Sequence, residues 1–274
     1  MKLINSSFEI YDQKPGLEGI YEAIEYAGRT CYKSTRPEGQ TAKDFVDRMI
    51  ASKHTAMLEH GTVYFKVPAN IDVAGNFLDE NPLWTKCKHI TCSEGNWWAI
   101  TTNLRVMVEH FAPEYIEELM EKYLCDPTEY HEKRITVRFT ANIHFYKDIT
   151  RHRVFSWAIE STRFCNYIKE KFNMSVSFMR PTWIKECDIL DLEEDCKVLE
   201  SIYFKWLNKG YQAQHAAYFL PQGTKAEIVI TGFASDYNHF FDLRARGTTG
   251  APHPDVKALA EPLMEEFYKR DYLK

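Results

Sequence analysis

The segment 135–145, ITVRFTANIHF, places the strongest constraint on the fold of this chain. Polar residues separate its apolar residues, which are Ile135, Val137, Phe139, Ala141, Ile143 and Phe145. Successive side chains of a strand point to opposite faces of a sheet, so the pattern predicts a strand with one face in the core, or a strand that runs into a helix near its end. Shorter strands are expected at 62–68, 174–180 and 226–231.

Apolar residues recur at three- and four-residue spacing in 16–28 and 42–53, which predicts two amphipathic helices. Thr41 and Asp44 have the spacing of a capping box at the start of the second helix. Further helices are expected at 113–124, 192–218, 235–243 and 254–270. Strands and helices alternate without a regular βαβ rhythm, so we expect an α+β fold, with a mixed or antiparallel sheet core and flanking helices.

Composition narrows the class of protein. A net charge of −5 argues against a protein that coats nucleic acid, although a local basic site for a small anion is compatible with it. No run approaches the ~20 apolar residues of a membrane span, and the N-terminus becomes charged too early for a secretory signal. Seven cysteines without framework spacing indicate reduced thiols. We therefore expect a soluble cytoplasmic protein.

Familiar ligand motifs do not occur in the sequence. Neither GxGxxG nor GxxxxGK[ST] is present, so side chains or another fold must hold any nucleotide. Cys87-Lys-His89-Ile-Thr-Cys92 has no second pair at metal-ligand spacing, so we expect no metal site.

The densest polar cluster is RHRVFSWAIESTRF at 151–164. Arg151, His152 and Arg153 are adjacent, and Ser161 and Arg163 follow. The planar guanidinium groups suit a phosphate or the carbonyl edge of a pyrimidine, and an anion would relieve the repulsion between neighbouring cations. Taken alone, an RHR triplet more often indicates a solvated basic turn, or arginines paired with acidic neighbours.

The wider context favours a binding site. RHR, seven residues and then Ser resembles the signature of the flavin-dependent thymidylate synthase family. Three further segments resemble that family in the same order, namely GRTCYKS at 28–34, HTAMLEHGTVYFKV at 54–67 and SDYNHFFDLRARG at 235–247. The resemblance implies a single domain over 1–274 with this fold, and 69–134 is interpreted as an insertion within it.

The resemblance also implies an activity. Such an enzyme is a homotetramer with sites built from several subunits, and it binds FAD. It methylates dUMP to dTMP, with methylenetetrahydrofolate as carbon donor and NADPH as reductant. The cofactor carries the redox chemistry, while the protein supplies orientation and positive charge.

Flavin contacts are implied for five residues. By position in the motifs, Arg151, His152 and Arg153 should bind FAD, with Arg151 between flavin and nucleotide. His60 should lie near the flavin ring or the folate stacked on it. His239 stands where the family has an asparagine that contacts FAD.

Nucleotide contacts are implied for the second half of the signature. Ser161 and Arg163 should hold dUMP, the arginine at its phosphate, and Arg244 should reach the pyrimidine carbonyls. These three residues are the expected catalytic groups. Arg151 and Glu160 complete the expected substrate site.

Several positions depart from the family pattern, all on the nucleotide side. Asp148 replaces a glutamine, and Ala158 and Ile159 replace an Asn-Glu pair. Glu160 offers a carboxylate one residue late, which in a regular strand or helix faces another direction. An arginine expected before Leu220-Pro221 is missing. A related flavoenzyme acting on another pyrimidine nucleotide is therefore the alternative. A non-catalytic nucleic-acid-binding protein is the alternative of another class, which the net charge disfavours.

Overall fold

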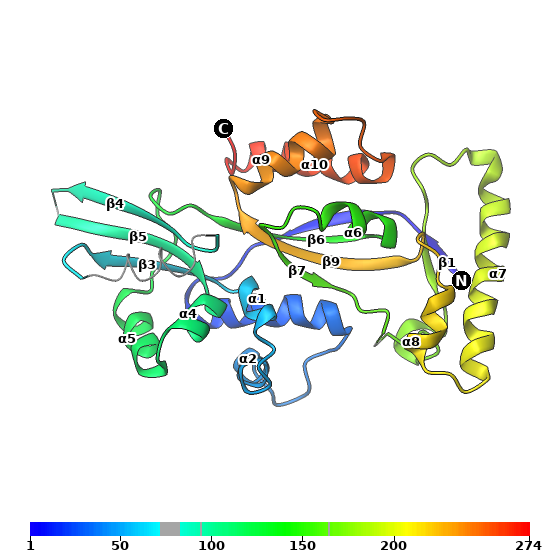
Figure 1. Cartoon of the computed structure of the whole chain (residues 1–274), viewed down its shortest axis with the longest axis horizontal. Coiled ribbons are helices and arrows are strands. Elements are labelled where there is room, and N and C mark those ends of the chain that lie inside the picture. The colour runs from blue at the N-terminus through cyan, green and yellow to red at the C-terminus, as the bar shows by residue number, and fades with distance from the viewer. Residues whose placement is uncertain (72–82, 94, 164) are drawn as a thin grey trace.

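The central feature of the computed structural model is a four-stranded antiparallel sheet in the order β2-β6-β9-β7. The structure describes residues 1–71, 83–93, 95–163 and 165–274. The strands are β2 (Ser7–Tyr11), β6 (Arg134–Asn142), β7 (Ser156–Ile159) and β9 (Lys225–Phe233). The α+β prediction is confirmed, since helices cover both faces of this sheet (Figure 1).

The predicted strand 135–145 is β6 followed at once by the helix α6 (Ile143–Ile149). The change of structure has a local cause. The Asn142 side chain accepts a hydrogen bond of 2.7 Å from the backbone N–H of Phe145 and so caps α6. The alternation of apolar and polar residues ends here because the chain passes from strand to helix, and α6 then leads to the RHR triplet.

One face of the sheet packs against α6, α9 (Asp236–Phe241) and α10 (Pro254–Lys269). Val137, Phe139, Ile228 and Ile230 of the strands are buried against these helices. A π-helical turn, Asp242–Arg246, links α9 to the segment that leads into α10. In Figure 1, α9 and α10 lie above the sheet.

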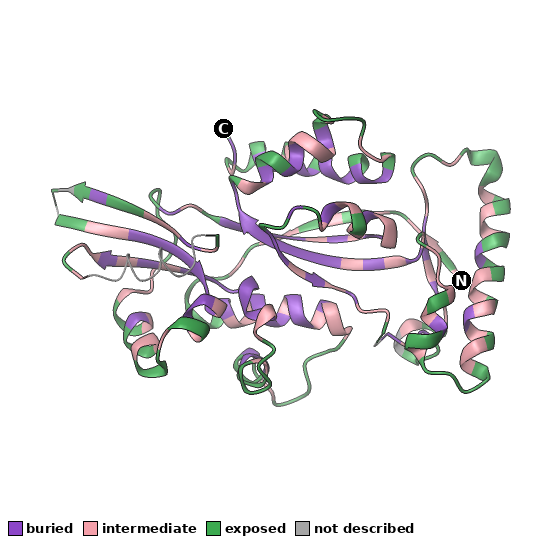
Figure 2. Cartoon of the chain, viewed as in Figure 1, coloured by how far each residue is buried: buried purple, intermediate pink, exposed green. Residues whose placement is uncertain are grey.

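The opposite face packs against α1 (Gly16–Tyr32), whose Ile20 and Ile24 meet Ala158 of β7 and Val229 of β9. Next to α1 lies α2 (Ala42–Ala51), which begins with the predicted capping box of Thr41 and Asp44. The 3-10 helix Thr55–His60 connects α2 to β3 (Thr62–Pro68). In Figure 2, buried residues dominate the central strands β6 and β9.

A second sheet, in the order β3-β5-β4, extends the core on the α1 side. It includes β4 (Lys86–Cys92) and β5 (Gly95–Asn103), followed by α4 (Leu104–His110) and α5 (Pro113–Tyr123). These elements come from 69–134, whose status as an insertion stays a prediction. Of this segment, residues 72–82 and 94 lie outside the described part.

The third cluster of buried residues lies beneath α7 (Ile189–Asn208), close to the parallel pair β1 (Lys2–Ile4) and β8 (Ser177–Met179). The single helix expected over 192–218 is wrong. Gly210 adopts a left-handed φ of 89° and ends that helical path, and the short α8 (Ala213–Ala216) follows. No helix in the described ranges is long and apolar enough to cross a membrane.

Candidate functional site

The RHR turn, Arg151–Arg153, directly follows α6. The backbone N–H of His152 donates to the Ile149 carbonyl at 3.0 Å, which closes the turn. Arg151 and Arg153 are exposed, whereas the imidazole between them is buried. The turn therefore presents two guanidinium groups to solvent around an inward-pointing ring.

The His152 ring lies against α9. Its centroid is 5.2 Å from that of Phe240 and 5.5 Å from that of His239. The Nε–H of Arg244 donates to His152 Nε2 at 3.1 Å, so this nitrogen is an acceptor and the neutral ring carries its proton on Nδ1. Burial, followed by the charges of Arg244 and His239, lowers the pKa of His152 to about 4.

The π-helical turn holds Arg244 in this position. A second donor of its guanidinium binds the backbone carbonyl of Asp148 at 2.5 Å. The structure thus joins the RHR turn to the Leu243-Arg244 segment and to α6. π-helical turns are often found at functional sites. The carboxylate of Asp148 lies 3.8 Å from His144 Nε2, so the side chain beside it is a histidine of its own helix.

The second half of the signature lies at the other end of β7. Ser156 pairs with Thr231 of β9 and Ile159 pairs with Ile228, so Glu160 comes beside Glu227. From Phe155 to Glu160 the chain advances about 17 Å at ~3.3 Å per residue. The RHR turn and Ser161 are therefore separated by the length of the strand.

The two halves also lie on opposite faces of the sheet. His152 contacts the α9 side, whereas the backbone N–H of Ser161 donates to the carbonyl of Cys31, near the end of α1, at 3.1 Å. Ser161 is half-buried and Arg163 is exposed. The structure does not bring Ser161 and Arg163 to the RHR turn and Arg244 within one chain.

Four charged side chains surround the start of β9 and are here called the charge cluster: Lys33, Glu160, Lys225 and Glu227. Glu160 Oε2 lies 2.8 Å from Lys225 Nζ and 3.6 Å from Lys33 Nζ. Glu227 Oε1 lies 2.5 Å from Lys33 and 2.8 Å from Lys225. The one-residue displacement of Glu160 from the family position thus places its carboxylate in a buried ion network.

Electrostatics within the charge cluster favour the ionised form of Glu227. Burial alone would raise the pKa of Glu227, but Lys225 and Lys33 outweigh it and lower this pKa to about 2. Burial lowers the pKa of Lys33, while for Lys225 burial is outweighed by Glu160 and Glu227, which raise its pKa.

No role was predicted from the sequence for Lys33, Lys225 or Glu227. Lys33 lies within the GRTCYKS segment, and Lys225 and Glu227 occupy alternate positions at the start of a predicted strand. That alternation was the available signal, because two charges facing one side of a buried strand require partners.

His60 is fully buried beneath the central sheet. Its Nδ1 lies 2.8 Å from Thr231 Oγ1, which in turn lies 2.8 Å from Thr136 Oγ1. Burial and the nearby Arg134 lower the pKa of His60 to about 3. Within this chain the ring is closed off by protein, so any contact with a bound flavin requires an opening on this side.

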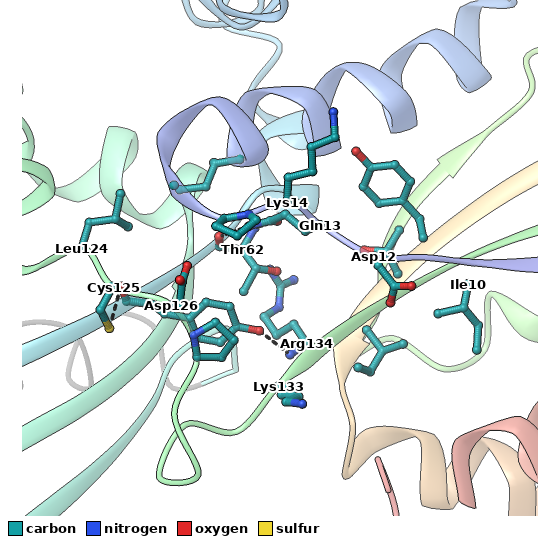
Figure 3. Close-up of a pocket in the computed structure, with 18 of the residues that line it drawn as sticks. Ile10, Asp12, Gln13, Lys14, Thr62, Leu124, Cys125, Asp126, Lys133 and Arg134 are labelled. Carbon is teal, nitrogen blue, oxygen red and sulfur yellow. Dashed lines mark hydrogen bonds between the residues drawn. The ribbon is translucent and has the colours of Figure 1, made fainter. Parts of the chain in front are cut away.

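Two cavities lie away from the RHR turn. A groove of about 570 Å³ beside Lys33 and Glu227 includes Arg29, Arg36 and Arg138 in its wall. A cavity of about 410 Å³ lies between the N-terminus of α1, β3 and β6 (Figure 3). None of the site residues predicted from the sequence lines either cavity. In the described ranges, no group of three or more metal-ligating side chains is arranged to hold a metal ion.

Comparison with known proteins identifies the class. Residues 87–271 match the family described as thymidylate synthase complementing protein. The chain belongs to this family, which is that of the flavin-dependent thymidylate synthases, so the family prediction is confirmed. The match begins inside 69–134, and the extent of the insertion therefore remains a prediction.

Individual relatives are distant. The flavin-dependent thymidylate synthase of Pyrococcus furiosus is 29% identical over 129 residues, which cover 46% of this chain and 50% of that protein. The Sulfurisphaera tokodaii enzyme of the same name is 30% identical over 121 residues, 44% of each chain. The alignments thus span about half the length of these relatives. The crystal structure of a UMP/dUMP methylase, PolB from Streptomyces cacaoi, bound with 5-Br UMP is 14% identical. It has a TM-score of 0.47 and covers 98% of this chain and 92% of that one.

Proposed function

We propose that this protein is an FAD-dependent thymidylate synthase, which forms dTMP from dUMP with methylenetetrahydrofolate as carbon donor and NADPH as reductant. The observation that carries the proposal is the contact between Arg244 and His152. It unites the two segments that the family resemblance assigns to flavin and pyrimidine, although they are far apart in sequence.

The residues at the RHR turn fit a flavin. Arg151 and Arg153 are exposed on either side of His152, so their guanidinium groups are accessible to an anionic diphosphate. His152 is neutral, and Arg244 retains N–H donors beyond the two used to anchor it. Bound flavin would supply the hydride chemistry, while these side chains orient it and balance its negative charge.

Ser161 and Arg163 are proposed to bind the nucleotide, with the arginine at the phosphate. Arg244 is proposed to donate to the pyrimidine carbonyls and to stabilise negative charge that develops on the ring. Since the two halves of the signature lie at opposite ends and faces of the sheet, we infer that a complete site combines the RHR turn of one subunit with Ser161 of another. A homotetramer provides this arrangement.

Complementation between variants tests the shared site. Arg151→Ala and Arg163→Ala should each have little activity as separate proteins. Subunits exchanged between them would form some sites with both arginines intact, so the mixture should regain part of the wild-type rate. A mixture that exchanges subunits yet stays as inactive as its components would contradict a site shared between subunits.

Tritium release from C5 of the nucleotide tests the reaction itself. The flavin-loaded protein should release tritium from dUMP with NADPH and methylenetetrahydrofolate present. A purified protein that is colourless and does not bind added FAD would contradict the proposal at its first step.

A related activity on another pyrimidine nucleotide is the second candidate. It is favoured by Asp148, Ala158 and Ile159, which depart from the family pattern on the nucleotide side. Tritium release from UMP or dCMP that exceeds release from dUMP would support it. The nucleic-acid-binding alternative instead predicts binding that is strongly salt-dependent and independent of FAD.

A further inference from the structure

A small cavity of about 150 Å³ adjoins the charge cluster. Glu160 and Lys225 form one side of it, and Tyr167 and Phe172 contribute aromatic rings. At ~30 Å³ per water molecule, the volume corresponds to about five waters or one six-membered ring. Glu160 in its lining directly precedes Ser161, the residue proposed to bind the nucleotide.

Two buried polar atoms in the lining residues lack a hydrogen-bond partner among the residues that the structure describes. They are Oε1 of Glu160 and the hydroxyl of Tyr167. Glu160 is 3% exposed and Tyr167 is 4% exposed. Buried polar groups are nearly always hydrogen-bonded in native proteins, so two unpaired groups beside one cavity indicate a ligand that pairs them.

The chemistry of the two atoms defines the ligand. Glu160 Oε2 accepts hydrogen bonds from Lys225 and from the Glu227 backbone N–H, so Oε1 is the carboxylate oxygen left to accept from a ligand. Burial, with Glu160 next in effect, raises the pKa of Tyr167, so its hydroxyl remains protonated and can donate. The ligand must therefore present an N–H beside a carbonyl oxygen.

Uracil has this pattern, because its N3–H is flanked by two carbonyl groups. We propose that the cavity binds the uracil ring of the substrate, with N3–H donating to Glu160 Oε1, one carbonyl accepting from Tyr167 and the other left to accept from Arg244 of another subunit. The C5–C6 edge, on the opposite side of the ring from N3, then faces the mouth of the cavity. Cytosine has a bare acceptor at N3, which the carboxylate repels, so Glu160 and Tyr167 select uracil over cytosine.

This inference rests on the proposed function, since it names the part of the nucleotide that these residues recognise. Calorimetric titration of the flavin-loaded full chain with dUMP, N3-methyl-dUMP and dCMP tests it without altering the protein. The last two lack the N3–H, so each should bind at least about tenfold more weakly than dUMP.

Tyrosine variants provide the matched pair. Tyr167→Phe removes the hydroxyl alone and should weaken dUMP binding about tenfold. Tyr237→Phe removes the hydroxyl of another fully buried tyrosine, which donates to the Ile135 carbonyl on the α9 side of the sheet and does not line the cavity, and it should leave dUMP binding near the wild-type value. In crystals with 5-bromo-dUMP, the bromine should lie at the cavity mouth.

Equal affinity for dUMP and N3-methyl-dUMP, or unchanged binding by Tyr167→Phe, would overturn the inference. A bromine signal only at the RHR turn of the same subunit would also overturn it. Continued tritium release from dUMP in these cases would leave the proposed function standing. If dUMP neither binds nor releases tritium, both proposals fail together.

Discussion

Arg244 donates a hydrogen bond to Nε2 of His152, a residue 92 positions earlier in the chain. The contact holds a buried, neutral imidazole between two exposed arginines. It also connects the π-helical turn after α9 to the turn after α6. The geometry of the proposed flavin site therefore depends on two segments that fold against the same face of the sheet.

Arg151→Ala and Arg163→Ala should separate the two ligands. Loss of a guanidinium group at the RHR turn should reduce the flavin retained through purification, measured by visible absorbance. Loss of Arg163 should leave flavin in place and weaken dUMP binding, measured by calorimetry, because a charge-assisted hydrogen bond contributes about 1.5–3 kcal/mol. Loss of flavin from Arg163→Ala with intact nucleotide affinity would reverse the assignment.

Acid should destabilise the fold through His152. Its pKa falls from an ordinary value of 6.5 to about 4 in the folded protein, so protonation favours the unfolded chain. The stabilisation is complete above pH 6.5 and is lost as the pH falls toward 4, by roughly 2 kcal/mol at pH 5. Urea unfolding of wild type and His152→Gln between pH 7 and 4.5 measures this. The same pH slope in both proteins would contradict it.

Glu227→Gln should destabilise the protein by about 2–4 kcal/mol, because it leaves Lys33 and Lys225 with one carboxylate between them. Glu118→Gln is the control, since Glu118 forms an exposed pair with Lys122 and should change stability by less than about 0.5 kcal/mol. Because its pKa falls from 4.5 to about 2 in the folded protein, the contribution of Glu227 should be complete at pH 5, smaller but still present at pH 3.5, and lost only as the pH approaches 2. Urea titrations at pH 7, 5 and 3.5 test both statements, and equal effects of the two substitutions would contradict the first.

Gly232→Ala should cost about 1–3 kcal/mol through overpacking. A Cβ at this position would lie 2.2 Å from Cδ1 of Phe155, which follows the RHR turn. Gly223→Ala is the control, since a Cβ there meets no atom within 4 Å. Thermal unfolding compares the two. Combining Gly232→Ala with Phe155→Leu should recover part of the lost stability. If the double variant is no more stable than Gly232→Ala, the clash with Phe155 is not the cause of the loss.

Local patterns predicted the elements whose signals lie within one segment. The alternation of β6, the capping box of α2 and the period of α1 all depend on neighbours a few residues away. The hairpin β4–β5 was missed because Trp97, Trp98, Ala99 and Ile100 are consecutive apolar residues without alternation. The end of α7 was missed because apolar residues continue past Gly210.

The candidate site was predictable in composition but not in arrangement. The signature identified both halves, and a strand between them was foreseeable from the spacing alone. The contacts of Lys33 with Glu227 and of His152 with Arg244 join residues far apart in the chain. Each forms because a helix packs on the sheet, α1 on one face and α9 on the other, and no local pattern contains that information.

The π-helical turn around Arg244 also has a consequence for the length of this segment. A π-helical turn accommodates one residue more than the α-helix it interrupts. Deleting a single residue from 242–246 would restore a regular helix while rotating the following side chains by about 100°. The protein could thus keep its fold while the Arg244 guanidinium group points in another direction. The length of this turn is therefore as much a requirement for the site as the residues in it.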